Sequence, residues 1–439
     1  MGMSHADEQN HRQLFPEISA YFDPKNVDYK PKHQINFPVH HGRPELEGVP
    51  RPLNILSIGS EHTSGATLSN QYDAYPWLIG HPFHNHVDVL SFRPSSADYP
   101  SMCLESVSVR GDYRASYDLI LLDFNLNGSD GLPLLVKRLR ERYPDAVLVY
   151  VGLWSLMTNM EEAGTGKTIL EVGHDPSRDW KWKDEDFYVT GGLPGTTCTR
   201  EICTLEELQK VMQTYGGYVY EFPRPKSPEV CIREGWFIES DWHHLSETGH
   251  RVLANDLIFF LHDKHEALFN NYKSVGEWGL GDQCYNWMSS GSNPLATNGE
   301  LVDLLANVDV ESNRWALQFS SEEEGEIIVD SKFDIPVPLG IAYFSRYDPA
   351  DFNIVVISVN DETSYEIDPS INKSGLYIKN AVMSTFAHIG NASPGKNIIK
   401  ITTKEIRSRP FQVTGIFLCG ACAENGHLGQ GAANFHIET

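Results

Sequence analysis

The stretch NILSIGSEHTSGATL, residues 54–68, decides the fold. It begins as a short apolar run, typical of a strand that is buried on both faces of a sheet. It then passes into a turn rich in Gly, Ser and Thr. Many α/β hydrolases display a nucleophile on a turn that directly follows such a strand. The stretch therefore predicts an α/β fold, and it leaves open which residue of the turn carries chemistry.

Three further apolar runs repeat the strand pattern: VDVLSF (87–92), YDLILLDF (117–124) and AVLVYVGLW (146–154). Between the last two, DGLPLLVKRLRERYPD has leucines at helical spacing and Pro144 near its end. Strand, helix and strand in this order predict a parallel sheet. We expect a three-layer α/β/α domain over residues 52–265, in which residues 156–225 break the rhythm as an insertion.

The remaining segments differ in character. Residues 1–51 are polar and rich in His and Pro, which predicts an extended arm, and residues 266–311 form a Gly-, Asn- and Ser-rich connector. Short alternating runs at turn-punctuated intervals predict an all-β, jelly-roll-like sandwich over residues 312–422. Residues 423–439 are predicted to be a tail.

Charge and hydropathy exclude several partners. The chain holds 59 acidic and 35 basic residues, a formal charge of −24 that repels nucleic acids and anionic lipid headgroups. It contains no apolar run of about 18 residues, so direct membrane insertion is not predicted. The start lacks a signal peptide, which predicts a cytoplasmic protein, or a secretory or extracellular one if an upstream signal or anchor precedes it. The seven cysteines allow disulfides. The sequence leaves the oligomeric state open.

A second stretch, DWHHLSETGH at residues 241–250, complements the first. Asp241 lies three residues before His244, and a turn of small residues and a helix pattern follow. In this arrangement the carboxylate can orient one imidazole nitrogen while the other nitrogen faces a reacting group.

Together, the two stretches resemble the SGNH (GDSL-like) hydrolase superfamily, whose first block reads G-D-S-x-T-x-G and whose last reads D-x-x-H. Gly59, Thr63 and Gly65 match the first block, and Asp241 and His244 match the last. GATLSNQYDAYPWL, RLRERYPDAVLVYVGLW and HLSETGH also resemble SGNH-domain proteins of diatoms and related protists, which often carry a C-terminal β-sandwich. The resemblance implies a flavodoxin-like sheet and the hydrolysis of acyl or carbohydrate esters without a cofactor.

The departures from the family pattern are specific. The nucleophilic serine falls on Glu61, which has no hydroxyl to acylate, and Ser60 lies one residue early. Asn127 matches the oxyanion asparagine of the family, and Gly59 remains a candidate for ligand binding. The second-block glycine, which donates to the oxyanion, has no clear counterpart.

Several functional readings therefore stay open. The first is a pseudoenzyme, a degenerate site retained to bind a small-molecule or carbohydrate-like ligand. The alternatives are an active esterase or deacetylase that uses Ser60, or a site in which Glu61 and His244 activate water, assisted by His62, His243 or Asp130. We expect His62 and His243 to lie at the surface.

No metal is predicted, although carboxylates and imidazoles are concentrated in the two stretches, because adjacent residues rarely point at one ion. We expect Glu61, Asn127, Asp241 and His244 to meet at the carboxyl ends of the parallel strands, where open α/β sheets place their ligands.

Overall fold

The structure is a computed structural model, and it describes part of the chain. The described residues are 53–66, 68–80, 86–91, 96–104, 116–125, 131–183, 202, 204–262, 264, 276, 283–287, 295–303, 315–320, 324–346, 352–369 and 382–420. The predicted arm (1–51) and tail (423–439) lie outside them.

The first unit is built on a five-stranded parallel sheet. Its strands are β1 (Asn54–Gly59), β2 (His86–Ser91), β3 (Leu119–Asp123), β4 (Val147–Gly152) and β7 (Tyr218–Glu221). They lie in the order β2-β1-β3-β4-β7, which is the flavodoxin-like order. Every residue of β3 and β4 is buried, as the continuous apolar runs predicted. The predicted parallel sheet is confirmed.

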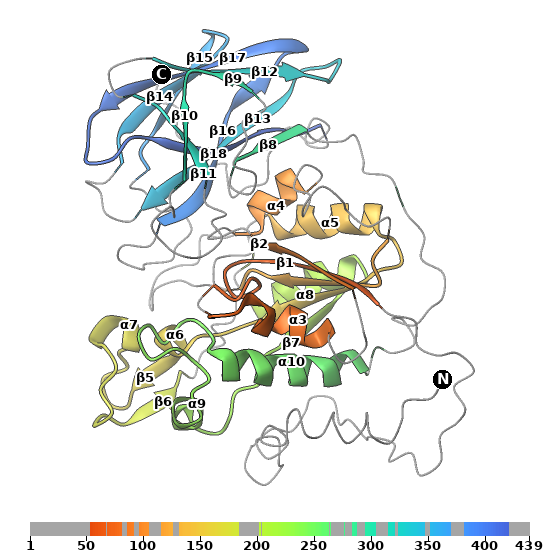
Figure 1. Cartoon of the computed structure of the whole chain (residues 1–439), viewed down its shortest axis with the longest axis vertical. Helices are drawn as coiled ribbons and strands as arrows, with labels where there is room; N and C mark the ends of the chain where they lie inside the picture. The colour runs from red at the N-terminus through yellow and green to blue at the C-terminus, as the bar shows by residue number, and fades with distance from the viewer. Residues whose placement is uncertain are drawn as a thin grey trace.

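Helices cover both faces of this sheet (Figure 1). On one face lie α3 (Tyr75–Gly80) and α10 (Glu247–His262), which pack on each other. On the other face lie α4 (Asp98–Cys103), α5 (Leu132–Arg142) and α8 (Leu205–Thr214). Helix α5 contacts both α4 and α8. The three-layer α/β fold is therefore confirmed. No helix of the described part of the chain is long and apolar enough to cross a membrane.

The segment after β4 folds as a small lobe beside the sheet (Figure 1). The lobe comprises α6 (Leu156–Asn159), β5 (Met160–Glu162), α7 (Ile169–Val172) and β6 (Trp180–Trp182). Elsewhere in the unit, a short 3-10 helix, η1 (Gln71–Asp73), precedes α3. Strands β5 and β6 pair antiparallel. After β7 follows α9 (Pro228–Arg233). The stretch predicted as an insertion thus also contains β7, a strand of the main sheet whose short sequence YVYE was not recognised.

The C-terminal unit consists of two antiparallel sheets. One has the order β10-β11-β18-β13-β16 with β8 on β18, and the other has the order β15-β14-β17-β12-β9. The bounds are β8 (Gln283–Asn286), β9 (Ala296–Thr297), β10 (Glu300–Asp303), β11 (Trp315–Gln318), β12 (Gly325–Ser331), β13 (Val337–Arg346), β14 (Ile354–Val359), β15 (Thr363–Ile367), β16 (Val382–Ala392), β17 (Gly395–Glu405) and β18 (Gln412–Leu418). The β-rich unit is as predicted, and β8, β9 and β10 add strands from the stretch predicted as a connector.

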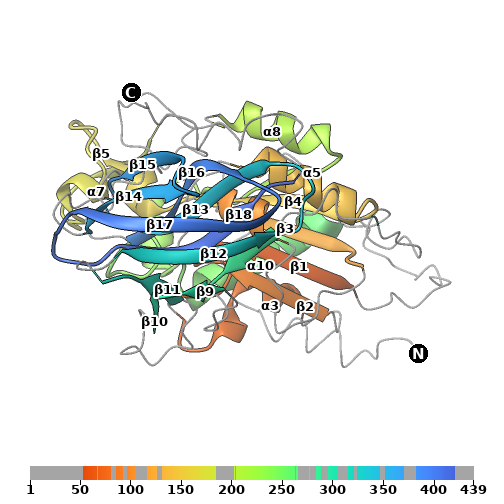
Figure 2. The ribbon, with the colours of Figure 1, turned by 90° about the horizontal axis from the view of Figure 1, so that it is seen from above.

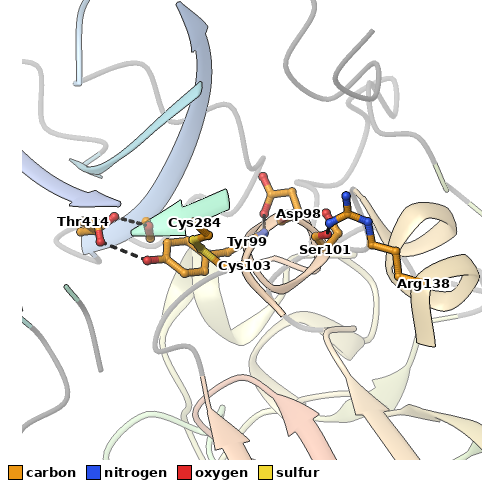
Figure 3. The surroundings of a disulfide bond; sticks show 8 residues. Asp98, Tyr99, Ser101, Cys103, Arg138, Cys284 and Thr414 are labelled. Carbon is orange, nitrogen blue, oxygen red and sulfur yellow. Dashed lines mark hydrogen bonds between the residues drawn. A yellow bond between two sulfur atoms is a disulfide. The ribbon is translucent and has the colours of Figure 1, made fainter. Parts of the chain in front are cut away.

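The sheet that contains β18 lies between the second sandwich sheet and the α/β unit (Figure 2). All seven residues of β18 are buried. A disulfide joins Cys103 at the end of α4 to Cys284 in β8, and the Tyr99 hydroxyl donates to the Thr414 carbonyl oxygen at 3.0 Å (Figure 3). Cys419, just after β18, is also disulfide-bonded. Covalent, polar and apolar contacts therefore join the two units.

A buried acid in this fold predicts how stability depends on pH. Asp256 on α10 accepts a hydrogen bond from the Tyr220 hydroxyl at 2.7 Å. Burial raises the pKa of Asp256 from 3.8 to about 6, although the Tyr220 hydrogen bond opposes the rise. Between these values the folded chain holds a proton that the unfolded chain has released, so the free energy of unfolding falls as pH rises.

Asp256→Asn removes this ionisation and keeps an acceptor for Tyr220. We expect the variant and the unmodified chain to be equally stable below about pH 4, and the variant to be more stable at pH 8 by up to about 3 kcal/mol. Urea unfolding from pH 4 to pH 8 measures this, with the exposed Glu247→Gln on the same helix as the control. The prediction would be contradicted if the free energies of unfolding of Asp256→Asn and the unmodified chain differed by the same amount at every pH.

Candidate functional site

The turn after β1 is held tightly at the carboxyl end of the sheet. The Ser60 N–H donates to the Asp123 carbonyl oxygen at 3.0 Å, which ties the turn to the end of β3. The Ala66 N–H donates to the Glu61 carbonyl oxygen at 3.0 Å, and Gly65 adopts a left-handed φ of 66°. Glycine adopts this conformation without a steric cost. The turn therefore fixes Glu61 directly beyond the strand.

The second motif forms the carboxylate–imidazole pair that its spacing predicted. Asp241 Oδ2 lies 2.7 Å from His244 Nδ1, and Asp241 Oδ1 accepts from the N–H groups of His243 at 2.8 Å and His244 at 3.0 Å. Partial burial raises the pKa of Asp241, but these hydrogen bonds outweigh it and hold the pKa below its usual value. Between the two motif residues, Trp242 has a φ of 54°. This conformation is uncommon for a large side chain and marks local strain.

The two motifs meet at His244. Glu61 Oε1 lies 3.9 Å from His244 Nε2, so the imidazole stands between two carboxylates. Ser60 is fully buried, and its Oγ hydrogen-bonds to no described residue. A nucleophilic serine must lie within hydrogen-bond reach of its base, and Ser60 does not. The structure thus places the acid, rather than the neighbouring hydroxyl, beside the imidazole.

Three imidazoles gather around this contact. The ring centroids of His62 and His243 lie 5.2 Å and 5.0 Å from that of His244, and His62 Nε2 lies 3.2 Å from the His243 carbonyl oxygen. The expected surface positions of His62 and His243 are wrong, because the two residues are only 1% and 4% exposed. Burial lowers the pKa of His62 far below its usual value and that of His243 to about 4. Both rings are therefore neutral at pH 7.

A buried acid, Asp123, lies beneath the turn and was missed by sequence reasoning. Thr63 Oγ1 donates to Asp123 Oδ2 at 3.0 Å and lies 3.3 Å from the Tyr75 hydroxyl. Burial raises the pKa of Asp123 to about 7; the Thr63 hydrogen bond opposes this, and repulsion by Glu61 adds to it. A signal was present, since YDLILLD places an acid at the carboxyl end of a buried strand, where ligands bind in open α/β sheets.

The predicted oxyanion residue is not placed by the structure. Asn127 and Asp130 lie outside the described residues. Asn125 is buried and donates to the Leu153 carbonyl oxygen, while its own Oδ1 accepts from no described residue. Gly59, the other predicted ligand-binding residue, ends β1 opposite Asp123.

The lobe after β4 reaches the second motif. The Met157 N–H donates to the Trp242 carbonyl oxygen at 2.9 Å. The His174 ring lies 4.5 Å from the Trp242 ring, and the Trp180 ring stacks on His174 at 5.8 Å. A row of aromatic rings therefore runs from the lobe to the residue between Asp241 and His243.

Comparisons with known proteins describe the fold alone. No protein-family model and no curated protein matches the chain. A two-domain esterase (CEX) active on acetylated mannans, co-crystallised with mannopentaose, is similar over 84% of this chain and 92% of its own, with 11% identity and a TM-score of 0.48. A CBM35 from Cellvibrio japonicus Abf62 is similar over 32% of this chain and 94% of its own, with 8% identity and a TM-score of 0.23. These similarities assign no activity to the chain.

The close packing at Gly59 predicts that the site tolerates no side chain there. A Cβ at this position would lie 2.0 Å from Thr63 Oγ1 and 2.7 Å from the Asp123 carbonyl oxygen. The carbonyl belongs to a buried strand and cannot yield without moving the backbone. We expect Gly59→Ala to lower the free energy of unfolding by about 1–3 kcal/mol. Urea unfolding followed by tryptophan fluorescence measures the change, and an unchanged midpoint would show that the turn is not packed as described.

Proposed function

We propose that this chain is a ligand-binding protein on a hydrolase-like fold, that its ligand is a carbohydrate or carbohydrate ester, and that it forms no acyl-enzyme. The observation that carries the proposal is the contact between Glu61 and His244. The Glu61 carboxylate lies 3.9 Å from the imidazole nitrogen that is not bonded to Asp241. A serine hydroxyl would have to occupy this position to be deprotonated and attack an ester.

The neighbouring serine does not replace the missing nucleophile. Ser60 Oγ is buried and has no hydrogen-bond partner among the described residues, while its backbone N–H donates to the Asp123 carbonyl oxygen. A shift of the turn by one residue would break that bond and would move Thr63 away from Asp123. The local hydrogen bonds therefore stabilise the register in which Glu61 faces His244.

Binding is supported by features that cost stability. Trp242 holds a left-handed backbone, and Asp123 Oδ1 and His62 Nδ1 are buried without a hydrogen-bond partner among the described residues. Strained backbone and unsatisfied buried polar atoms are characteristic of sites that are retained for a function. The bond between Asp241 and His244 also keeps the imidazole oriented. A site without a ligand would not need these arrangements.

The carbohydrate class follows from the side chains at the margin of the site. Trp242 is half-buried beside His174, and the exposed part of its ring would give the apolar face of a sugar ring a surface to pack against. Glu61, Asp241 and His244 offer polar atoms for its hydroxyl groups. A few polar groups beside aromatic surface are typical of small-molecule sites. The resemblance to a superfamily that acts on carbohydrate esters favours the same class.

One observation favours a second function, the hydrolysis of esters by activated water. The 2.7 Å contact between Asp241 and His244 is the orienting interaction that a general base requires. In this alternative Glu61 and His244 would hold a water molecule between them. The assay described next separates the two functions, because water activation depends on Glu61 and is independent of Ser60.

Glu61→Ser is expected to create weak esterase activity. The substitution places a hydroxyl beside an imidazole that Asp241 already orients, so it restores the residue type that nucleophilic attack requires. We expect hydrolysis of short-chain aryl esters at least about tenfold faster than by the unmodified chain. Glu61→Ala, which removes the charge without adding a hydroxyl, is the control. Hydrolysis by the unmodified chain that Ser60→Ala abolishes would overturn the proposal, and hydrolysis that Glu61→Ala abolishes would favour water activation.

Sugar binding is expected to depend on Trp242. Calorimetric titration of the full chain with acetylated and unsubstituted oligosaccharides should reveal a ligand. We expect its affinity to fall about tenfold in Trp242→Ala, or about 1.4 kcal/mol, because the stacking surface is lost. Trp315→Phe, in strand β11 of the sandwich, is the control and should leave the affinity unchanged. Equal binding by Trp242→Ala and the unmodified chain would place the sugar site elsewhere.

A further inference from the structure

Glu61, His243 and His244 form a compact set of ligand atoms. Each residue offers one such atom, a carboxylate oxygen or a ring nitrogen, and the three atoms lie within 4.8 Å of one another. Glu61 comes from the turn after β1, whereas the two histidines come from the loop before α10. Two segments about 180 residues apart in sequence therefore converge on one point.

The three ligand atoms are somewhat farther apart than the ligand atoms of a bound zinc ion. Tetrahedral zinc sites have bonds of about 2.0–2.1 Å, so their ligand atoms lie about 3.3 Å apart. Glu61 Oε1 and His244 Nε2 are 3.9 Å apart. All three ligand atoms lie within 4.8 Å of one another, so movements of about 0.5 to 1.5 Å bring the set to coordinating distance. Side-chain rotation alone allows movements of this size.

The surrounding hydrogen bonds orient the rings as in metal sites. His244 Nδ1 is bonded to the Asp241 carboxylate, which places the ring proton on Nδ1 and leaves the Nε2 lone pair facing Glu61. Metal-binding histidines nearly always donate their other ring N–H to a carboxylate, a carbonyl oxygen or water. Asp241 thus provides the outer interaction that a metal-bound His244 requires.

His243 provides an independent observation. Its side chain is 4% exposed, and its Nδ1 atom has no hydrogen-bond partner among the described residues. Buried polar atoms are almost always paired, and each exception needs an explanation. A bound cation is one partner that satisfies a buried imidazole nitrogen.

The backbone of Trp242 answers the objection that adjacent residues rarely share an ion. Its left-handed conformation, with a φ of 54°, bends the loop just before the two histidines. The rings of His243 and His244 then lie 5.0 Å apart at an interplanar angle of 89°. Two nearly perpendicular rings can direct one nitrogen each toward a common point.

We infer that Glu61, His243 and His244 bind a Zn²⁺ ion, with Asp241 holding the His244 ring in place. Two imidazoles and one carboxylate suit zinc, whereas Ca²⁺ and Mg²⁺ prefer sites made of oxygen ligands. Three protein ligands leave a fourth position for water or for an oxygen atom of a bound molecule. This inference goes beyond the proposed function, because metal binding and sugar binding are measured separately.

The test uses the full chain without an affinity tag, stripped with a chelator and then titrated with Zn²⁺ by calorimetry. We expect one ion per chain, confirmed by metal analysis after equilibrium dialysis, and no binding of Mg²⁺ under the same conditions. Co²⁺ should give the intense visible absorption of a tetrahedral site. A stoichiometry far below one Zn²⁺ per chain would overturn the inference.

Matched variants locate the site. We expect Glu61→Gln and His243→Asn to weaken Zn²⁺ binding at least about 100-fold and Asp241→Asn to weaken it about 10- to 100-fold. Glu247→Gln and His86→Asn, which change exposed residues on α10 and β2, should bind as the unmodified chain does. Equal binding by Glu61→Gln and these controls contradicts the site.

The variants also remain informative if folding is affected. Glu61→Gln is nearly isosteric, so it preserves the test if His243→Asn does not fold, and circular dichroism reports the fold of each variant. Sugar titrations repeated in chelator separate this inference from the proposed function. If the chain binds sugar but takes up no Zn²⁺, only the inferred metal site is contradicted. If it takes up Zn²⁺ but binds no sugar, only the proposed function is contradicted.

Discussion

The parallel pairing of β1 with β3 is the constraint on which the site depends. Its register ends with Gly59 opposite Asp123, and the next N–H, that of Ser60, continues the ladder to the Asp123 carbonyl oxygen. The chain must turn away at this point, and Thr63 then returns to cover the Asp123 carboxyl group. Glu61 is thereby held over the end of the sheet. A glycine at 59 is required because the returning turn leaves no room for a Cβ.

The elements that were predictable from sequence are those with a strong local pattern. β1, β3 and β4 are continuous apolar runs because both of their faces are covered. β7 was missed since its four residues, YVYE, are partly exposed and polar at one end. Strands β8, β9 and β10 are short and lie in a stretch rich in turn residues. They exist because partners distant in sequence supply their hydrogen bonds, and no local pattern reports such partners.

The same distinction holds for the site. The spacing of Asp241 and His244 is local, and it predicted their bond correctly. The burial of His62 and His243 was not predictable from polarity, because it results from two loops packing against each other across the end of the sheet. Asp123 lies outside both motifs, on the neighbouring strand β3, so the motif pattern does not indicate it. The roles of Glu61, Asp241 and His244 remain predictions, and their positions are observations.

The polar groups buried at the candidate site lower the stability of the fold. Asp123, His62 and His243 are all removed from water, and each has at least one side-chain atom without a hydrogen-bond partner among the described residues. Desolvating such groups costs free energy that packing elsewhere must offset. The two large apolar cores, one around the parallel sheet and one inside the sandwich, provide that stability. The fold thus tolerates a local cluster that would be unfavourable by itself.

The disulfide between Cys103 and Cys284 closes a covalent ring that spans a separation of 181 residues. The ring includes strands β3, β4 and β7, the lobe and the loop that carries Asp241, His243 and His244. Glu61 lies outside it. A protease that cut the backbone once anywhere between the two cysteines would therefore release no fragment, and the halves of the site would stay tethered to each other. The chain can be cut once between these cysteines and still remain one molecule.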